Sequence, residues 1–95
     1  MSKTVSKPVS KPVNKNVNKN VTMYWRPGCG FCAGLERQLV KHEIPFEKRN
    51  IWEDPDAAAF VRSVARGSET VPTVTVGDTS VVNPSVAEVA ELLAD

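Results

Sequence analysis

The chain has 95 residues, of which 41% are hydrophobic, and a formal net charge of +1. A chain of this length can bury one modest core, so a single domain is expected. It contains no secretory hydrophobic segment and no apolar run near the roughly 18 residues that a membrane span needs, so we expect a soluble, cytoplasmic protein. Two cysteines in such a reducing compartment indicate chemistry more often than a structural disulfide.

Residues 1–20 differ in character from the rest of the chain. They contain five lysines and no acidic residue, whereas residues 21–95 contain seven Lys and Arg against eleven Asp and Glu. The segment repeats every four residues, with one isolated Val per unit and no apolar face. Such a composition predicts a disordered tail, whose lysines give at most a loose attraction to anionic surfaces. The folded domain is therefore predicted to span residues 21–95.

The first half of this domain is predicted to be strand, helix, strand. β-Branched and aromatic residues predict a strand over 21–25, which an Arg-Pro-Gly sequence then ends. Apolar residues recur at helical spacing from Cys29 to about His42, and Pro45 is expected to end that helix. A second strand is predicted over 46–51, before the next helix begins.

The middle of the domain is predicted to be a helix followed by a hairpin. An Asp-Pro pair at 54–55 is typical of a helix start, and Gly67 is expected to stop the apolar stripe that follows. Short strands over 73–76 and 79–82 flank a Gly-Asp turn, which predicts an antiparallel pair.

An Asn-Pro pair at 83–84 repeats the helix-start pattern before a last helix. The resulting order is β-α-β-α-β-β-α, and strand–helix–strand units favour parallel pairing through right-handed crossovers. We therefore expect an α/β fold with a four-stranded mixed sheet flanked by three helices. Its first strand carries the cysteines to the carboxyl end of the sheet, where open α/β sheets usually place their sites.

Cys29 and Cys32 are the candidate reactive pair. If Cys29 lies at the helix start, unpaired N–H groups and the positive end of the helix dipole favour its thiolate, and Arg26 adds a nearby positive charge. Cys32 lies nearly one turn further along the same face, and about 5 Å between such Cα atoms suits a disulfide. We expect Cys29 to attack a substrate and the more buried Cys32 to resolve the product.

Residues 21–94 resemble the glutaredoxin branch of the thioredoxin superfamily, most closely the actinobacterial mycoredoxins. The resemblance depends on the strand that ends before Cys29-Gly30-Phe31-Cys32, on Thr70-Val71-Pro72-Thr73, on the element order, and on the segments at 50–61 and 81–85. It implies a monomeric thiol–disulfide oxidoreductase that reduces mixed disulfides between proteins and mycothiol. Mycothiol, rather than glutathione, is then the expected co-substrate, with no tightly bound cofactor, no specific nucleic acid and no membrane partner.

The resemblance also implies a surface that binds the thiol. Pro72 would follow a cis peptide bond and face the cysteines, and the Val71 backbone would pair with the bound thiol like an added strand. The chain lacks the Gly-Gly-x-Asp pattern with which many glutaredoxins hold glutathione before the last helix, and this departure favours mycothiol. The residues expected to bind the thiol substrate are Arg26, Phe31, Val71, Pro72, Asn83 and Ser85, and no metal ligands are expected.

Three alternatives concern the same region. The Gly-Phe pair between the cysteines resembles monothiol glutaredoxins with iron–sulfur clusters, so a cluster shared by two chains is an alternative that visible absorbance after anaerobic purification would detect. The motif Gly28-x-Gly30-x-x-Ala33 fits a loose dinucleotide fingerprint, but no second β-α-β half follows it. His42 is a candidate metal ligand or general base for a cysteine, but it lies about 15 Å along the helix from Cys32 and cannot reach that sulfur within one chain. Two cysteines are also too few for a structural zinc site, which usually has four nitrogen or sulfur ligands.

Overall fold

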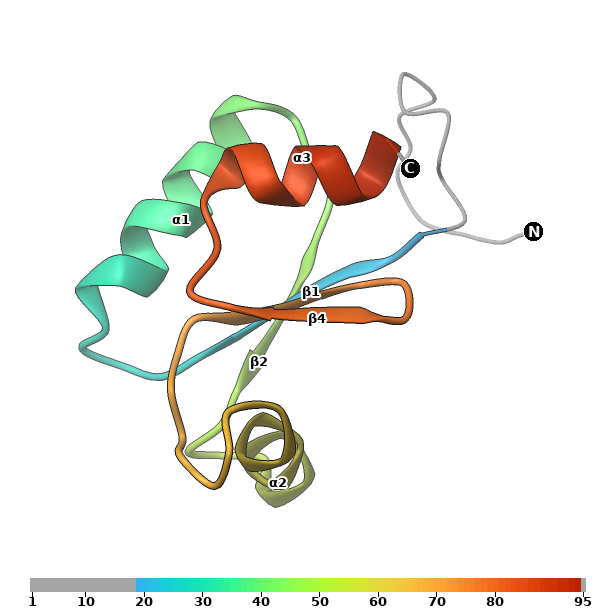
Figure 1. Ribbon diagram of the computed structural model, residues 1–95. Helices are drawn as coiled ribbons and strands as arrows, with labels where there is room; N and C mark the ends of the chain where they lie inside the picture. The colour runs from blue at the N-terminus through green and yellow to red at the C-terminus, as the bar shows by residue number, and fades with distance from the viewer. Residues whose placement is uncertain (1–18, 95) are drawn as a thin grey trace.

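The computed structural model describes residues 19–94. A four-stranded mixed sheet carries α1 and α3 on one face and α2 on the other (Figure 1). The elements are β1 Val21–Trp25, α1 Gly30–Lys41, β2 Glu47–Asn50, α2 Pro55–Val64, β3 Thr73–Val76, β4 Thr79–Val82 and α3 Val86–Ala94. This is the predicted β-α-β-α-β-β-α order, so the expected α/β fold is confirmed. Most of the predicted disordered tail, residues 1–18, lies outside the described residues.

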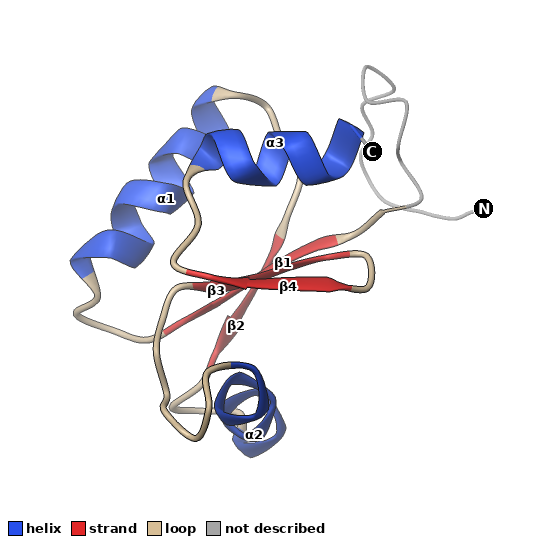
Figure 2. Cartoon of the chain, viewed as in Figure 1, coloured by secondary structure: helices blue, strands red, loops and turns tan. Residues whose placement is uncertain are grey.

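The strand order across the sheet is β2-β1-β3-β4 (Figure 2). β1 pairs with β2 in parallel, because α1 carries the chain back to the end of the sheet at which β1 began. In this register Met23 lies opposite Lys48. β1 pairs with β3 antiparallel, with Met23 opposite Val74, and β3 pairs with β4 antiparallel, with Val74 opposite Val81. The hairpin predicted around the Gly-Asp turn is confirmed, and Gly77 in that turn has a φ of 60°, which suits glycine.

Two apolar clusters cover the two faces of the sheet, because successive side chains of β1 point to opposite faces. Met23 is fully buried and packs with Leu39 of α1 and Val89 of α3. Tyr24 points to the other face, where it packs with Val61 of α2 and stacks on Phe60 with ring centroids 5.0 Å apart. The sheet is therefore held from both sides, and the loops at its carboxyl end are anchored by packed elements.

One strand differs in its bounds from the sequence prediction. β2 is shorter than the strand predicted over 46–51, although the N–H of Ile51 still donates to the carbonyl oxygen of Trp25 at 2.9 Å. The predicted end of the first helix near His42 is confirmed, because α1 ends at Lys41 with His42 as its C-cap, and the chain then turns at Glu43, whose φ is 57°.

α3 begins two residues later than predicted. The hydroxyl of Ser85 accepts the N–H of Glu88 at 3.2 Å, and the carboxylate of Glu88 accepts the N–H of Ser85 at 2.9 Å, which is a reciprocal capping box. Asn83 has a φ of 52° and donates its N–H to the carbonyl oxygen of Pro72 at 2.7 Å. The predicted helix start at Asn83 is wrong, because this contact with the loop before β3 fixes its backbone instead.

The residues immediately before β1 contact the folded domain. The ammonium of Lys19 donates to the carbonyl oxygen of Leu92 at 2.8 Å, near the end of α3. The carbonyl oxygen of Asn20 accepts the N–H of Gly77 at 3.0 Å, at the β3–β4 turn. These contacts bring the beginning of β1 and the end of α3 together at one end of the molecule.

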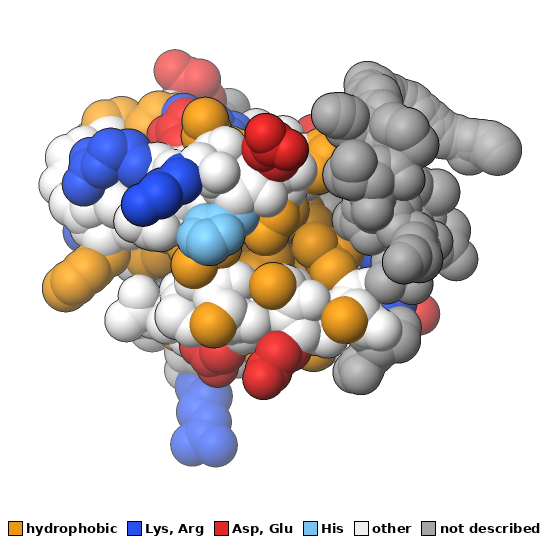
Figure 3. Space-filling view, turned by 90° about the horizontal axis from the view of Figure 1, so that it is seen from above, with side chains coloured by type: hydrophobic (Ala, Val, Ile, Leu, Met, Phe, Trp, Pro, Cys, Tyr) orange, Lys and Arg blue, Asp and Glu red, His pale blue; other side chains and the backbone are white. Residues whose placement is uncertain are grey.

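Figure 3 shows charged, polar and apolar side chains mixed over the outer surface of α1 and α3. Val40 on α1 is 62% exposed, although its neighbour Leu39 is fully buried. Such a change between adjacent residues is typical of an amphipathic helix on a sheet. In the part of the chain that the structure describes, no helix is long and apolar enough to cross a membrane.

Candidate redox site

The loop between β1 and α1 brings Cys29 to the start of the helix. Gly28 has a φ of 81°, a left-handed conformation that glycine adopts at no steric cost, and the space around it would admit a Cβ. Cys29 then has extended backbone angles, φ −89° and ψ 105°, as helix-capping residues do. The prediction that Cys29 lies at the beginning of α1 is confirmed.

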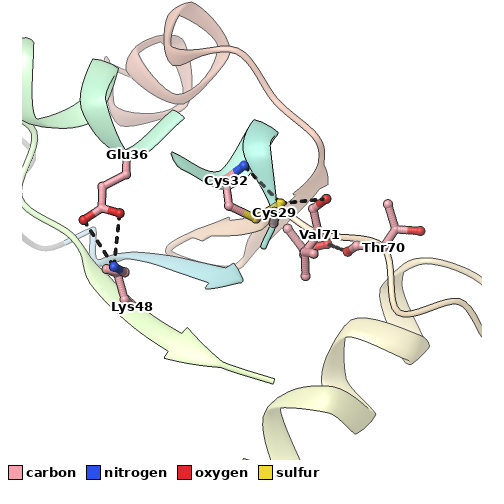
Figure 4. Close-up of a disulfide and its surroundings, with 7 residues drawn as sticks. Cys29, Cys32, Glu36, Lys48, Thr70 and Val71 are labelled. Carbon is pink, nitrogen blue, oxygen red and sulfur yellow. Dashed lines mark hydrogen bonds and ion pairs between the residues drawn. A yellow bond between two sulfur atoms is a disulfide. The ribbon is translucent and has the colours of Figure 1, made fainter. Parts of the chain in front are cut away.

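Cys29 and Cys32 form a disulfide within this first turn, with Cα atoms 5.2 Å apart (Figure 4). The Sγ of Cys29 accepts the N–H of Cys32 at 3.1 Å, so this sulfur caps the helix in the manner of an N-cap oxygen. Cys32 is 2% exposed, whereas Cys29 is half-buried. Of the two sulfurs, Cys29 is therefore the more accessible and the one that the helix start stabilises as an anion.

The loop before β3 faces the disulfide. The Val71–Pro72 peptide bond is cis, and the carbonyl oxygen of Val71 lies 3.8 Å from the Sγ of Cys29 (Figure 4). Pro72 is fully buried, and its carbonyl oxygen is the acceptor for Asn83. The cis bond that the family resemblance implied is confirmed, and it lies beside Cys29.

An exposed aromatic and cationic surface lies near the same end of the sheet. Phe31, between the two cysteines, is 75% exposed. Trp52 follows β2 and is 63% exposed, and the guanidinium carbon of Arg26 lies 5.8 Å from the centroid of its ring. This distance is within the range of a cation–π interaction, so the ring of Trp52 helps to position Arg26.

The residues predicted to bind the thiol substrate do not all lie in one place. Val71 lies beside Cys29, Pro72 continues the same loop, and Asn83 is joined to that loop through its backbone. Ser85 instead uses its hydroxyl to cap α3. Within residues 19–94, no three or more His, Cys, Asp or Glu side chains are grouped so as to hold a metal ion.

An ion pair that the sequence interpretation missed connects α1 with β2. Lys48 on β2 donates to the two carboxylate oxygens of Glu36 at 3.1 and 3.2 Å, and its ammonium lies 4.4 Å from the ring centroid of Trp25. Glu36 follows Cys32 by four residues on α1, and Figure 4 shows the Glu36 carboxylate directed toward Lys48 on β2. The four-residue spacing is visible in the sequence, but the pairing with Lys48 depends on how α1 packs across β2.

A second charged pair holds the start of α2. The carboxylate of Asp54 accepts the N–H groups of Asp56 and Ala57 and forms an ion pair with Arg49 at the end of β2. The hydrogen bond between the two side chains is the main cause that lowers the pKa of Asp54 and raises the pKa of Arg49. The helix start predicted at Asp54 is confirmed, and it anchors one end of the loop that carries Trp52.

Comparisons with known proteins agree with this site. The family model described as Glutaredoxin matches residues 21–81. A protein of Mycobacterium tuberculosis H37Rv named "Putative glutaredoxin" is 41% identical over 69 residues, which cover 72% of this chain and 82% of that protein.

Solved structures show the same likeness. The glutaredoxin-like protein NrdH-redoxin of Escherichia coli is 32% identical, with a TM-score of 0.58 over 66% of this chain and 80% of that one. The glutaredoxin Grx-1 of Archaeoglobus fulgidus, at 23% identity, shares the fold with a TM-score of 0.67 over 94% of this chain and 100% of that one. With the family match and a Cys-x-x-Cys disulfide at a helix start, the chain belongs to the glutaredoxin family of thiol–disulfide oxidoreductases.

Proposed function

We propose that this protein reduces mixed disulfides between proteins and a low-molecular-weight thiol, with Cys29 as the nucleophile and Cys32 as the resolving cysteine. The observation that carries the proposal is the asymmetry of the pair. Cys29 is half-buried and its Sγ accepts a backbone N–H at the helix start, whereas Cys32 is 2% exposed. Because the thiolate is the attacking species in disulfide exchange, the first step belongs to the sulfur that is both accessible and stabilised as an anion.

The proposed cycle has two exchange steps. The thiolate of Cys29 attacks the small thiol's sulfur in the mixed disulfide, the substrate's sulfur–sulfur bond breaks, and the protein leaves as a thiolate that takes a proton from solvent. Cys29 then holds the small thiol as a disulfide. A second molecule of that thiol attacks the adduct and frees Cys29, or Cys32 attacks it and forms the disulfide of Figure 4.

The bound thiol is proposed to lie along the loop before β3. The carbonyl oxygen of Val71 lies 3.8 Å from the Sγ of Cys29, so a molecule attached to that sulfur would run alongside the Val71 backbone. Phe31 and Arg26, which flank the cysteine in sequence, offer an exposed apolar ring and a positive charge near the same edge. Asn83 is joined to Pro72 and belongs to the same neighbourhood.

Mycothiol is the small thiol that we propose the site prefers. Glutathione has two carboxylates and an ammonium, so a pocket that favours it should offer paired charges before α3. Residues 79–85 carry hydroxyls and one amide but no charged side chain. Such groups suit a sugar-rich thiol, because its hydroxyls can be hydrogen-bonded without a buried counter-charge.

Steady-state kinetics on one substrate protein, carrying either mycothiol or glutathione at the same cysteine, tests this preference. We expect the higher kcat/KM for the mycothiol adduct, and Cys29→Ser should abolish turnover of both. An equal or higher kcat/KM for glutathione would overturn the mycothiol proposal and leave the glutaredoxin assignment in place. Turnover that survives Cys29→Ser would overturn the mechanism itself.

A second candidate function is the dithiol reduction of ordinary protein disulfides. The E. coli NrdH-redoxin, 32% identical to this chain, is described as a glutaredoxin-like protein with a thioredoxin-like activity profile. In that reaction Cys29 attacks the substrate disulfide and Cys32 displaces the bound protein. The variant Cys32→Ser distinguishes the two candidates, because it keeps mixed-disulfide reduction by the first mechanism and loses turnover by the second.

A further inference from the structure

We propose that Asn83 is a positioning residue whose backbone, rather than its side chain, holds the loop before β3 against Cys29. The inference rests on the proposed function, in which the bound thiol lies along the backbone of Val71. Asn83 need not touch the reacting sulfur atoms for this role. It acts through a main-chain hydrogen bond to Pro72, the residue that follows Val71.

The backbone conformation of Asn83 is unusual for its place in the sequence. Its φ is 52°, in the left-handed region, which costs energy for a residue with a Cβ although asparagine tolerates it better than most. Asn83 also precedes Pro84, and the residue before a proline is biased toward extended backbone. Such a conformation persists where surrounding contacts fix it, and residues of this kind cluster at functional sites.

Buried groups on two sides fix this conformation. The N–H of Asn83 donates to the carbonyl oxygen of Pro72 at 2.7 Å, and Pro72 is fully buried. Pro84, the next residue along the chain, is buried as well, whereas Asn83 itself is exposed. The backbone of Asn83 is therefore held between two buried prolines, while the residue as a whole lies at the surface.

The hydrogen bond extends the β3–β4 pairing by one step. The register of the two antiparallel strands ends with Thr73 opposite Val82, and the bond from Asn83 to Pro72 joins the next residue on each side. Proline has no N–H, so it returns no second bond of the kind that an antiparallel pair usually exchanges. The loop before β3 is thus tied to the loop before α3 by the N–H of Asn83.

The loop that Asn83 holds is the one beside the nucleophile. The carbonyl oxygen of Val71 lies 3.8 Å from the Sγ of Cys29 and one residue before the carbonyl that Asn83 binds (Figure 4). On the other side of Val71, the hydroxyl of the fully buried Thr73 donates to the carbonyl oxygen of Thr70 at 2.8 Å. Because Val71 lies between the two acceptor carbonyls, these bonds together fix how its backbone faces the cysteine.

Glycine and alanine at position 83 separate a backbone role from a side-chain role. Both substitutions remove the amide side chain, so a role that depends on that amide is lost equally in the two variants. Glycine adopts a positive φ at no steric cost, whereas alanine does not. In ordinary helix or strand positions the order is reversed, because alanine is there the more stabilising residue. A backbone role therefore predicts that Asn83→Gly outperforms Asn83→Ala.

Amide hydrogen exchange in the substrate-free protein tests the hydrogen bond itself. We expect the protection factor of the residue-83 amide, corrected for intrinsic rates, to be about tenfold lower in Asn83→Ala than in Asn83→Gly, from the cost of a Cβ in the left-handed region. Equal protection in the two variants, or greater protection in Asn83→Ala, would overturn the proposal. The measurement needs no substrate, so its outcome is independent of the proposed function.

Turnover of a mixed disulfide tests whether the position of the loop matters for the reaction. We expect kcat/KM to be about tenfold lower for Asn83→Ala than for Asn83→Gly. Alkylation of Cys29 by iodoacetamide should proceed at the same rate in both variants, because the N–H of Cys32 that caps its sulfur is untouched. Equal kcat/KM values, or a parallel loss of the alkylation rate in Asn83→Ala, would overturn the proposal.

Glu43 provides a matched control. Its φ is 57°, and it follows the twelve-residue helix α1, which places it roughly 20 Å along the helix axis from Cys29. Glu43→Gly and Glu43→Ala carry the same backbone difference far from the site, and their kcat/KM values should be equal. A gap as large as that at position 83 would mean that the assay reports general stability, and it would overturn the proposal. Urea unfolding of all four variants confirms that each is folded in the assay.

Discussion

Replacing each cysteine in turn by serine isolates the other thiol, and we expect Cys29 to be alkylated much faster than Cys32 at pH 6. The reason lies in the helix cap. In Cys32→Ser protein the thiolate of Cys29 keeps a backbone donor, the N–H of residue 32, which lies 3.1 Å from its Sγ in the oxidised form. It also stays at the positive end of the α1 dipole.

Two contributions set the size of the difference. A side-chain cap at a helix N-terminus stabilises by about 0.5–2 kcal/mol, and a negative charge in the first turn gains about 0.3–1 kcal/mol from the dipole. Together they favour the thiolate by about 1–3 kcal/mol, which is a factor of roughly 5–150 in thiolate fraction below the free-thiol pKa of about 8.5. Cys32 receives no such cap and is 2% exposed, which slows any reagent further. We therefore expect at least a tenfold difference in rate.

The assay follows the two reduced single-cysteine proteins with iodoacetamide at pH 6 by intact mass. The same reaction in concentrated urea is the control, because both thiols should then react at nearly the same rate. Equal rates in the folded proteins, or a faster Cys32, would refute the assignment of Cys29 as the nucleophile. The helix-cap argument alone would be refuted if the difference persisted unchanged in urea.

Three further predictions concern stability. Leu39→Ala removes a fully buried side chain and should cost about 2–5 kcal/mol in urea unfolding, whereas Val40→Ala, at a 62% exposed position, should change stability by less than about 0.5 kcal/mol; similar losses would contradict the described core. Ser85→Ala should cost about 1 kcal/mol and lower the Tm by several degrees in calorimetry, and no change would argue against the capping box. Because the pKa of Asp54 is lowered in the folded state, its stabilising contribution is present above the unfolded-state pKa and is lost as the pH falls through the folded-state value. Asp54→Asn should therefore be less stable than the native protein at pH 7, and the two unfolding curves should converge in acid; a constant gap would refute this.

Much of the fold could be predicted because local patterns decide it. The alternation along β1 sends Met23 and Tyr24 to opposite faces, as a period of two requires. The cap at Asp54 and the position of Cys29 at a helix start also follow from short stretches of sequence. The cis bond at Pro72 was predictable only through the family resemblance, because a Val-Pro sequence by itself is rarely cis.

The features that were missed depend on contacts between distant segments. The Asn-Pro pair predicts a helix cap at Asn83, but a hydrogen bond to Pro72 gives Asn83 another conformation. The spacing of Ser85 and Glu88 is the local signal that indicates the true helix start. The pairing of Glu36 with Lys48 joins a helix to an edge strand, and no short pattern contains it. Candidate residues could thus be found from the sequence, whereas their charge partners required the packed structure.

The bond from Lys19 to the carbonyl oxygen of Leu92 has a practical meaning for protein engineering. It brings the two ends of the described domain together, and β1 runs from there to the loop that carries Cys29, at the opposite end of the molecule (Figure 1). A fluorescent reporter or second enzyme joined before β1 or after α3 would therefore emerge on the side remote from the disulfide. The domain is suited to work as a fused redox module, tethered at one end while it exchanges electrons at the other.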